Sequence, residues 1–557
     1  MRYRISQLKI DPRSTVEQDL EKLLEAAVRR EIGRSTHRKG MRDAKINALE
    51  IIRESIDARK KPDVKLVYTV DFDCDEQLPF DEAKRRQYAI PPLGETWAMA
   101  DRQPDASERP VVVGFGPCGM FAALILAEAG LKPIVMERGK CVEERVADVE
   151  QFWTQCAAPD PESNVQFGEG GAGTFSDGKL TTGIKDIRIR KVLEELVEAG
   201  ADPKILYQHR PHIGTDKLRE IVPVIRKKIE RLGGEVRFCT RLEDFEYEEG
   251  RIKHIKVVSH ADPSGNADCK DAHIDYIETS CVILAIGHSA RDTFGMLYER
   301  GFRMEQKPFS IGVRIEHPQK LIDENQYGDP ELAEILGPAD YKLSYRCAGS
   351  TDRADVAGRG VYTFCMCPGG QVINASTEAD TSVTNGMSVS NRDSGIANSG
   401  LLVDVRTEDF ADEHPLSGIE FQRKYEKLAW ENRTEGGMAR STYGQFRRNT
   451  GDGLPGAPDE DPVRKSLPAF ASEAITEAMP VFGRRIKGFD GDDAKLTAVE
   501  SRSSSPVRVL RDETMQAIGF QGVIPAGEGP GYAGGIMSAA VDGIRAAEKI
   551  ITGLPQR

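Results

Sequence analysis

The spacing of hydrophobic side chains predicts a small α+β unit at the start of the chain. Apolar positions alternate in residues 2–10, and β-branched and aromatic side chains crowd residues 63–72, as expected for two strands. Between them, residues 15–33 repeat apolar positions at helical spacing and stop at Gly33. Residues 47–58 fit either a strand or a helix. The apolar face expected for the helix consists of Val16, Leu20, Leu23, Leu24 and Ala27.

A polar connector broken by prolines closes this first unit, residues 1–105, and a different pattern follows. Residues 110–139 read as strand, tight turn, helix and strand, and residues 281–287 as a buried strand ending in glycine. An amphipathic helix is expected at 215–234. This order predicts an α/β domain with a parallel sheet over residues 106–302. The connector prolines are Pro79, Pro91, Pro92 and Pro104, and the inward residues of the helix are Leu218, Ile221, Val222, Ile225, Ile229 and Leu232.

Residues 303–490 mix strands and helices without repeating that order, which suggests an inserted α+β domain that covers or holds a substrate. Residues 491–557 return to an apolar strand, a glycine loop and a helix, so we expect them to complete the α/β domain. The insertion's strands are expected at 308–317, 360–368 and 371–376, and its helices at 421–432 and 468–483.

Composition and charge limit the classes of protein to which the chain can belong. Hydrophobic residues make up 39% and charged residues 30%, as in an ordinary soluble globular protein. The net charge of −13 argues against a protein that coats nucleic acid. No apolar run follows the basic start, as in a signal peptide, and none approaches the ~20 residues of a membrane helix. Ten cysteines in so long a chain are no disulfide framework, so we expect the reducing cytoplasm.

A glycine fingerprint, Gly114-Phe-Gly116-Pro117-Cys-Gly119, joins the first strand of the α/β domain to its helix. Gly114 permits the tight turn, Gly116 lets the backbone approach a pyrophosphate, and Gly119 lets helix and strand pack closely. The start of the helix offers free N–H groups and a partial positive charge to the same anion. The motif therefore predicts a dinucleotide site.

An acidic residue stands where such a site needs one. Glu137 ends the second strand, 18 residues past Gly119, and is placed to accept hydrogen bonds from the ribose hydroxyls of an adenosine. Arg138 is either a further adenosine contact or a solvated side chain. A glycine turn in a nucleotide-free sheet is the alternative, but it leaves the agreement of strand, turn, helix, strand and acid unexplained.

Two further segments contain glycines that suit a cofactor. The run 168–180 exposes consecutive backbone donors, as an anion-binding loop does, and a nicotinamide-only domain has no need of it. Lys179 in this run is placed to reach a phosphate or the flavin edge, unless the side chain is merely solvated. The strand ending Ala285-x-Gly287 lets the chain turn away close to a bound cofactor. The residues of the loop expected at the cofactor are Gly173, Thr174 and Lys179.

The C-terminal segment adds a feature typical of flavoproteins. An apolar strand runs into Gly527-Glu528, and after a glycine loop a helix starts near Gly535 or Ile536, just beyond Gly534. The acid is placed near the ribityl and phosphate groups, and the helix start faces the flavin pyrimidine ring. Its dipole favours the negative charge of a reduced flavin by ~0.3–1 kcal/mol, and by ~2 kcal/mol when partly buried.

These motifs resemble those of two-domain flavoproteins of the glutathione-reductase-like superfamily, which bind FAD extended across the sheet. That superfamily has Gly-Asp where this chain has Gly527-Glu528, so the longer acid changes the contact there. The resemblance implies that the backbone at Leu242 lies near the adenine. A narrower resemblance, over nearly the whole chain, is to a group of uncharacterised bacterial FAD-dependent dehydrogenases. It is carried by PFSIGVRIEHPQ (308–319), FCMCPGGQVINAS (364–376), TNGMS (384–388) and VESRSSSPVRVLRD (499–512).

Candidate reactive side chains are few. His288 follows the strand at 281–287 and is either a proton donor near the flavin or a surface histidine. Arg502 and Arg508 flank a serine run and are candidates to hold an anionic substrate. Cys365 and Cys367 suit a redox pair or half a metal site, but without a second pair we expect two packed core thiols, dispensable for turnover. No metal site is expected.

The sequence thus predicts an α/β protein with a discontinuous Rossmann-type FAD-binding domain, an inserted α+β substrate or cap domain and a small N-terminal α+β domain. We expect an FAD-dependent oxidoreductase, with its adenosine half at 111–138 and its flavin half at 527–536, acting on a small molecule. NAD(P)H is a possible electron donor, without a second complete Rossmann domain. The alternatives are a flavin monooxygenase and an RNA-binding flavoprotein that uses residues 29–61, where eleven Lys or Arg face five acids.

Overall fold

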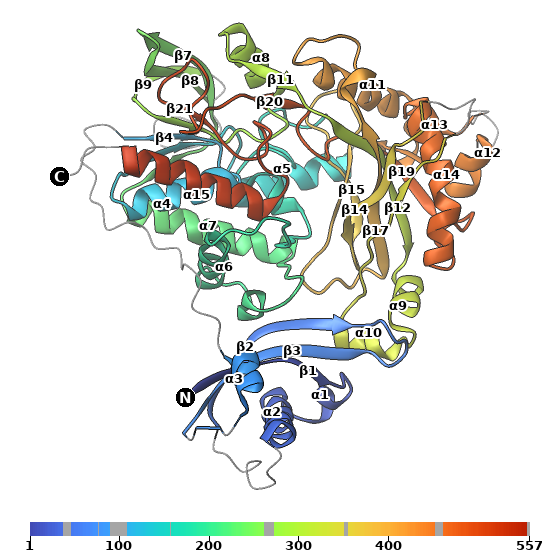
Figure 1. Cartoon of the computed structure of the whole chain (residues 1–557). Coiled ribbons are helices and arrows are strands. Elements are labelled where there is room, and N and C mark those ends of the chain that lie inside the picture. The colour runs from blue at the N-terminus through green and yellow to red at the C-terminus, as the bar shows by residue number, and fades with distance from the viewer. Residues whose placement is uncertain are drawn as a thin grey trace.

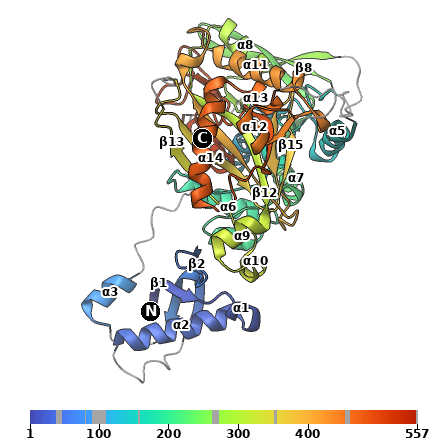
Figure 2. The ribbon, with the colours of Figure 1, turned by 90° about the vertical axis from the view of Figure 1, so that its right-hand side faces the viewer.

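The computed structural model has three parts (Figures 1 and 2). A small N-terminal unit lies at one end, a helix-covered parallel sheet forms one side of the main body, and a large antiparallel sheet forms the other. The connector prolines lie outside the described residues. The structure describes residues 1–36, 46–75, 77–78, 80–89, 109–155, 158–260, 272–349, 355–451 and 460–553.

The N-terminal unit is a three-stranded antiparallel sheet with the order β1-β3-β2. The helix α2 (Leu20–Thr36) packs on it, and α3 (Glu82–Tyr88) follows. The ambiguous segment at 47–58 is a strand, because its side chains pair along the whole length of β3. Within the basic stretch 29–61, residues 37–45 lie outside the described residues. The strands are β1 (Arg2–Ile10), β2 (Ile46–Asp57) and β3 (Lys65–Cys74).

The first helix differs from its predicted form at both ends. It is split into a short turn, α1 (Ser14–Glu17), and α2, because the carboxylate of Asp19 accepts N–H bonds from Glu21 at 2.9 Å and Lys22 at 3.2 Å and so starts a new helix. Val16 therefore lies outside the apolar face and is 70% exposed. Gly33 does not end the helix, which continues to Thr36.

The main parallel sheet has five short strands in the order β21-β10-β4-β5-β6. The helices α4, α6, α7 and α15 pack on one face, and the antiparallel strands β7, β8 and β9 cover the other (Figure 1). Of the inward residues predicted for α7, only Leu232 is wrong; it caps the helix and is 39% exposed. The strands are β4 (Val111–Val113), β5 (Ile134–Met136), β6 (Glu235–Arg237), β7 (Thr240–Glu248), β8 (Arg251–Ser259), β9 (His273–Glu278), β10 (Val282–Leu284) and β21 (Val523–Pro525), and the helices are α4 (Pro117–Glu128), α6 (Arg188–Glu198), α7 (Thr215–Arg231) and α15 (Ile536–Gly553).

The second large sheet is antiparallel, with the order β13-β14-β17-β12-β19-β18. The strand β19 (Lys495–Glu500) pairs with β12, so the α/β domain does not resume at residue 491 as expected. The chain returns to it only after this strand, where β20 pairs with β11. The other strands of this sheet are β12 (Phe309–Pro318), β13 (Ser344–Arg346), β14 (Gly360–Cys367), β17 (Ile396–Val405) and β18 (Ala439–Thr442). Two separate two-stranded sheets pair β11 (Met304–Gln306) with β20 (Val507–Val509) and β15 (Gln371–Asn374) with β16 (Thr384–Met387).

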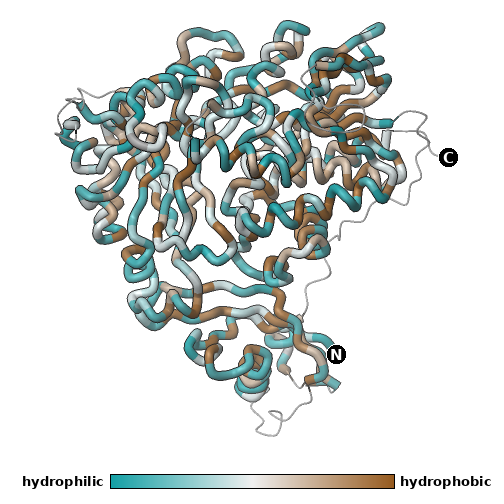
Figure 3. Tube along the Cα trace, turned by 180° about the vertical axis from the view of Figure 1, so that it is seen from behind, coloured by the Kyte–Doolittle hydropathy of each residue, from teal (hydrophilic) through white to brown (hydrophobic). Residues whose placement is uncertain are grey.

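Helices surround this second sheet, and α14 packs along its outer side. Hydrophobic residues concentrate in the strands of both sheets and in α4, whose residues 118–127 are all buried (Figure 3). Among the described residues, none of the helices has the length and apolar character needed to cross a membrane. The remaining helices are α5 (Val142–Gln155), α8 (Arg291–Glu299), α9 (Gln319–Tyr327), α10 (Glu331–Leu336), α11 (Ser417–Glu431), α12 (Tyr443–Arg448), α13 (Pro462–Lys465) and α14 (Ala469–Arg485).

Candidate functional site

A cavity of about 380 Å³ lies at the carboxyl edge of the parallel sheet. The ends of β5, β4, β10 and β21 are neighbours along this edge and contribute Glu137, Gly114, Gly287 and Glu528 in that order. Ligands of open α/β sheets bind at this edge. The predicted residues that line the cavity are Gly114, Gly116, Pro117, Glu137, Arg138, Gly173, Lys179, Leu242, Ala285, Gly287, His288, Arg502, Glu528, Gly534, Gly535 and Ile536, whereas Gly119, Thr174, Gly527 and Arg508 do not line it.

The fingerprint glycines have different surroundings. Gly114 has a φ of +97°, and a Cβ there would lie 2.4 Å from the carbonyl oxygen of Ala285. A Cβ at Gly119 would lie 1.9 Å from the carbonyl oxygen of Gly114, so this position serves the contact between helix and strand. At Gly116 the nearest atom would be 3.8 Å away, so the backbone borders open cavity where α4 begins. A ligand anion therefore has access to the first N–H groups of the helix.

Glu137 holds the loops around this end of the cavity together. Its carboxylate accepts backbone N–H bonds from Phe115 at 2.8 Å, Gly139 at 3.0 Å and Gly168 at 2.9 Å. Arg138, beside it, donates to Glu162 at 2.8 Å and to both oxygens of Asp292 at 3.0 Å, so it is not a solvated side chain. Because a carboxylate accepts about four hydrogen bonds, Glu137 retains acceptor capacity toward the cavity.

The loop at 168–180 contributes two of its three predicted residues to the cavity. Gly173 and Lys179 line it, but Thr174 is buried, where its hydroxyl donates to the carbonyl of Glu169 at 2.9 Å. The Lys179 Nζ lies 3.2 Å from Asp177 and 3.9 Å from the Sγ of Cys367. Its ammonium is thus held on the side of the cavity that faces β14.

The C-terminal segment borders the cavity through Glu528 and the start of α15. A Cβ at Gly534 or Gly535 would have no atom within 4 Å, whereas one at Gly527 would lie 2.8 Å from the Cβ of Cys118. Gly527 therefore packs against α4 rather than facing the cavity. Burial raises the pKa of the Glu528 carboxyl to about 7, although the charge of Lys307 opposes the shift.

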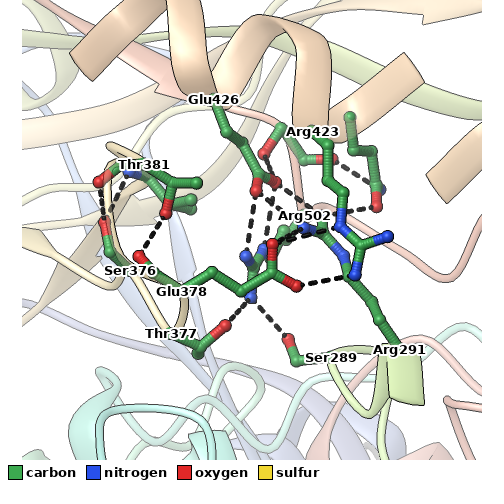
Figure 4. A network of polar contacts seen from close by, with 12 residues as sticks. Ser289, Arg291, Ser376, Thr377, Glu378, Thr381, Arg423, Glu426 and Arg502 are labelled. Carbon is green, nitrogen blue, oxygen red and sulfur yellow. Dashed lines mark hydrogen bonds and ion pairs between the residues drawn. The ribbon is translucent and has the colours of Figure 1, made fainter. Parts of the chain in front are cut away.

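The predicted anion-binding arginines do not converge. Arg502 donates to Glu426 at 3.0 and 3.1 Å, to Ser289 at 3.1 Å and to Thr377 at 2.7 Å, so its guanidinium is committed to protein groups (Figure 4). Arg508 lies on β20 and pairs with Glu305 at 3.1 Å. The structure therefore does not bring the two arginines together, because Arg502 lines the cavity with its guanidinium paired to Glu426 and Arg508 lies outside the cavity lining.

His288 lines the cavity, but its charge state does not suit a proton donor. Burial, with the charges of Arg502 and Arg291 nearby, lowers the pKa of His288 to about 3. The imidazole is therefore neutral at physiological pH. Its Nδ1 lies 3.0 Å from the hydroxyl of Ser289.

Several lining residues were missed by sequence reasoning, and the cysteine pair was misjudged. Cys365 lines the cavity instead of packing in the core, while Cys367 is fully buried behind it. Asp177, Asn385 and Glu500 also line the cavity. Asn385 and Glu500 lie in the segments TNGMS and VESRSSSPVRVLRD. In the sequence, these segments carry only the resemblance to uncharacterised bacterial FAD-dependent dehydrogenases, and no pattern there marks Asn385 or Glu500 as a site residue. Their positions at the cavity depend on contacts between strands that are distant in the sequence, and the periodicity of hydrophobic residues does not reveal such contacts.

Comparison with known proteins finds two family models that match parts of the chain and one long relative. Residues 308–503 match the family model described as FAD-dependent protein, C-terminal domain-like, and residues 2–73 match a domain of unknown function, DUF8436. An uncharacterised protein of Clostridium beijerinckii is 44% identical over 518 residues, which cover 91% of this chain and 92% of that protein.

Solved structures resemble the chain only distantly. A geranylgeranyl bacteriochlorophyll reductase-like protein from Thermoplasma acidophilum is 13% identical, with a TM-score of 0.35 over 80% of this chain and 78% of that one. The glycerol-3-phosphate dehydrogenase of Bacillus halodurans, complexed with FAD, is 10% identical, with a TM-score of 0.35 over 82% of this chain and 67% of that one. Scores this low support no argument about activity. By its long match, the chain belongs to the family of the Clostridium beijerinckii protein and carries an FAD-dependent protein C-terminal domain-like region at residues 308–503.

Proposed function

We propose that the protein is an FAD-dependent oxidoreductase that holds a non-covalent FAD along the carboxyl edge of its parallel sheet and acts on a small molecule. One observation carries the proposal. The glycine loop that begins α4 and the start of α15, more than 400 residues apart in the sequence, line one cavity. FAD needs both, the first for its adenosine and pyrophosphate and the second for a ring that becomes anionic on reduction, whereas FMN lacks the adenosine and NAD lacks such a ring.

The lining residues fit the parts of FAD in the order of the strands. Glu137 and the backbone near Leu242 would hold the adenosine, and the backbone at Gly116 the pyrophosphate. Gly535 and Ile536 at the start of α15 would face the ring, where the helix dipole favours negative charge. This arrangement supports the finer assignment to the glutathione-reductase-like flavoproteins. Bound FAD would supply the chemistry of electron-pair transfer.

The chain's own residues would exchange protons with the substrate or cofactor and would bind the electron donor. A Glu528 carboxyl with a pKa of about 7 exchanges a proton near neutral pH at the ring end, which neutral His288 does not. The described residues contain a single parallel sheet, so NAD(P)H, as donor, would bind without a second complete Rossmann domain.

A substitution at Gly116 tests the cofactor site. Gly116→Trp should fill the space beside the α4 start, so the folded variant should purify without flavin absorbance, while the wild type releases FAD identifiable by chromatography. Gly295→Trp is the matched control, because a Cβ there meets no atom within 4 Å and the residue lies in α8, outside the cavity lining. A folded Gly116→Trp protein with a full complement of FAD would refute the loop assignment. A refolded wild type that takes up no FAD would refute the function.

A further inference from the structure

The end of β14 carries a second chemical feature of the same cavity, the pair Cys365 and Cys367. The pairing of β14 with β17 shifts register between Phe364 and Cys367, and Cys365 has a φ of +43°. In a regular strand both thiols would point to one face without contact between them. Here the irregularity turns Cys365 into the cavity, and the Cys367 thiol lies beside it, where its Sγ donates to the Cys365 carbonyl oxygen at 3.3 Å.

Cations surround the pair. Lys179 lies 3.9 Å from the Sγ of Cys367, and Arg314, which is fully buried, donates to the carbonyl oxygen of Cys365 at 2.9 Å. The nearest acid to Lys179, Asp177, is also paired with Arg392 at 2.6 Å. Arg314 is itself paired with Glu500 at 2.7 Å, so Lys179 is the cation that favours a negative charge at the sulfurs.

The two thiols differ in acidity. The neighbouring Cys367 thiol, with the charges of Lys179 and Arg314, holds the pKa of the Cys365 thiol well below that of a free thiol. Its bond with Cys365 and its burial raise the pKa of Cys367. One thiolate that faces a cavity, backed by one protonated thiol, is the arrangement that thiol–disulfide exchange uses.

We propose that Cys365 and Cys367 form a redox-active dithiol that exchanges with small disulfides entering the cavity. The Cys365 thiolate attacks one sulfur of the disulfide, a new S–S bond forms, the old one breaks, and one thiolate leaves. The Cys367 sulfur then attacks Cys365 while its proton passes to the second leaving sulfur. The protein dithiol is oxidised by two electrons, the entering disulfide is reduced, and the products are a thiolate, a thiol and the protein disulfide.

Two other accounts of the pair fit less well. Core packing does not explain an irregular strand that directs one thiol into a cavity. A metal site needs further ligands, and the described residues contain no cluster of three or more His, Cys, Asp or Glu side chains suited to an ion. The proposed exchange at the dithiol does not require bound FAD. The two sites are nevertheless close, because a negative charge on Cys365 contributes to the raised pKa of the Glu528 carboxyl.

A redox titration of the full-length protein tests the proposal. The protein is equilibrated in dithiothreitol buffers of stepped reduced-to-oxidised ratio, alkylated with iodoacetamide and digested with trypsin. Cleavage after Arg359 and Arg392 releases one peptide, 360–392, that contains both cysteines and no other. As the buffers become more oxidising, we expect this peptide to change reversibly from a doubly alkylated form to an unalkylated disulfide form, which is two hydrogens lighter than the unmodified dithiol peptide. In the reduced protein, Cys365 should be alkylated about tenfold faster than Cys141, an internal reference whose thiol pKa is raised by burial.

Variants separate the roles of the two sulfurs. Cys365→Ser should abolish both the fast alkylation and the disulfide, whereas Cys367→Ser should keep the fast alkylation and form only mixed disulfides. Cys347→Ser, which removes a buried thiol outside the cavity lining, should change neither. A peptide that stays a dithiol throughout, or a Cys365 no faster than Cys141, overturns the proposal. Because the readout is a peptide mass, a protein that binds FAD but fails this test rejects the dithiol alone.

Discussion

At the scale of single residues, the acids of the cavity differ because their surroundings differ. Glu137 has three backbone donors, so its carboxylate is held in place. No described residue donates a hydrogen bond to the Glu528 carboxyl, and burial raises its pKa to about 7. Both acids follow parallel strands of one sheet, and burial without hydrogen-bond donors among the described residues suits the Glu528 carboxyl to gain and lose a proton near neutral pH.

Glu528→Gln should change how stability depends on pH. The folded pKa of about 7 lies above the unfolded value of 4.5, so the folded state holds this proton more tightly and loses stability as pH rises through that window. Glutamine does not ionise. The variant of the flavin-free protein should match the wild type at low pH and exceed its free energy of unfolding at pH 8 by about 1–3 kcal/mol.

Urea unfolding near pH 4.5 and at pH 8 measures the difference directly. Glu249→Gln, at an exposed turn between β7 and β8, is the matched control and should not alter the pH dependence. An unchanged difference between the two pH values in Glu528→Gln would contradict the placement of this proton.

At the scale of elements, a buried ion network joins the two halves of the main body. Glu426 on α11 accepts from Arg291 of α8 at 2.7 and 2.9 Å and from Arg502, which follows β19 (Figure 4). The sequence suggested Arg502 as a candidate to hold an anion because its partner, Glu426, stands 76 residues earlier on α11, where sequence spacing does not reveal the pair. Although Arg502 lines the cavity, its guanidinium thus forms part of the ion network that joins α8 and α11.

Glu426→Gln should strongly destabilise the protein. The change leaves Arg291 and Arg502 buried without their carboxylate, and breaking a buried pair in this way costs about 3–5 kcal/mol. Glu420→Gln on the same helix removes a carboxylate that is 67% exposed and should cost at most about 1 kcal/mol. Denaturant unfolding of both variants is the measurement. Equal losses would show that the network contributes no more than a surface pair.

The pattern of hydrophobic residues was sufficient to predict helices and strands whose packing partners are close in the sequence. Residues 110–139 and 215–231 form the predicted strands and helices, because each buries one face against its neighbours. The pattern failed where a distant contact decides the outcome. The strand β19 joins a sheet built mainly from earlier strands, and the register shift of β14 against β17 places Cys365 at the cavity. One local contact was also missed, because the Asp19 carboxylate accepts from the N–H groups of Glu21 and Lys22 and so splits the first helix.

At the scale of the whole molecule, the N-terminal unit has its own core and stands apart from the main body (Figure 2). None of its described residues lines the cavity. It touches the body at a few points: the Glu54 N–H donates to the carbonyl of Tyr207 at 2.9 Å, Arg13 pairs with Asp329, and Val64 packs into the core of the second sheet. A separate family model also matches this unit alone.

We therefore expect a chain that begins at Arg109 to fold and to keep its FAD. The cofactor contacts proposed above all lie after this residue, so the ratio of FAD to protein should equal that of the full-length chain. Loss of the contacts at Tyr207, Asp329 and Val64 should lower the melting temperature by about 1 °C for each kcal/mol of docking energy removed. The flavin content and thermal unfolding of the two proteins, purified in parallel, measure both effects. A truncated protein that folds but no longer holds FAD would show that the N-terminal unit takes part in forming the cofactor site.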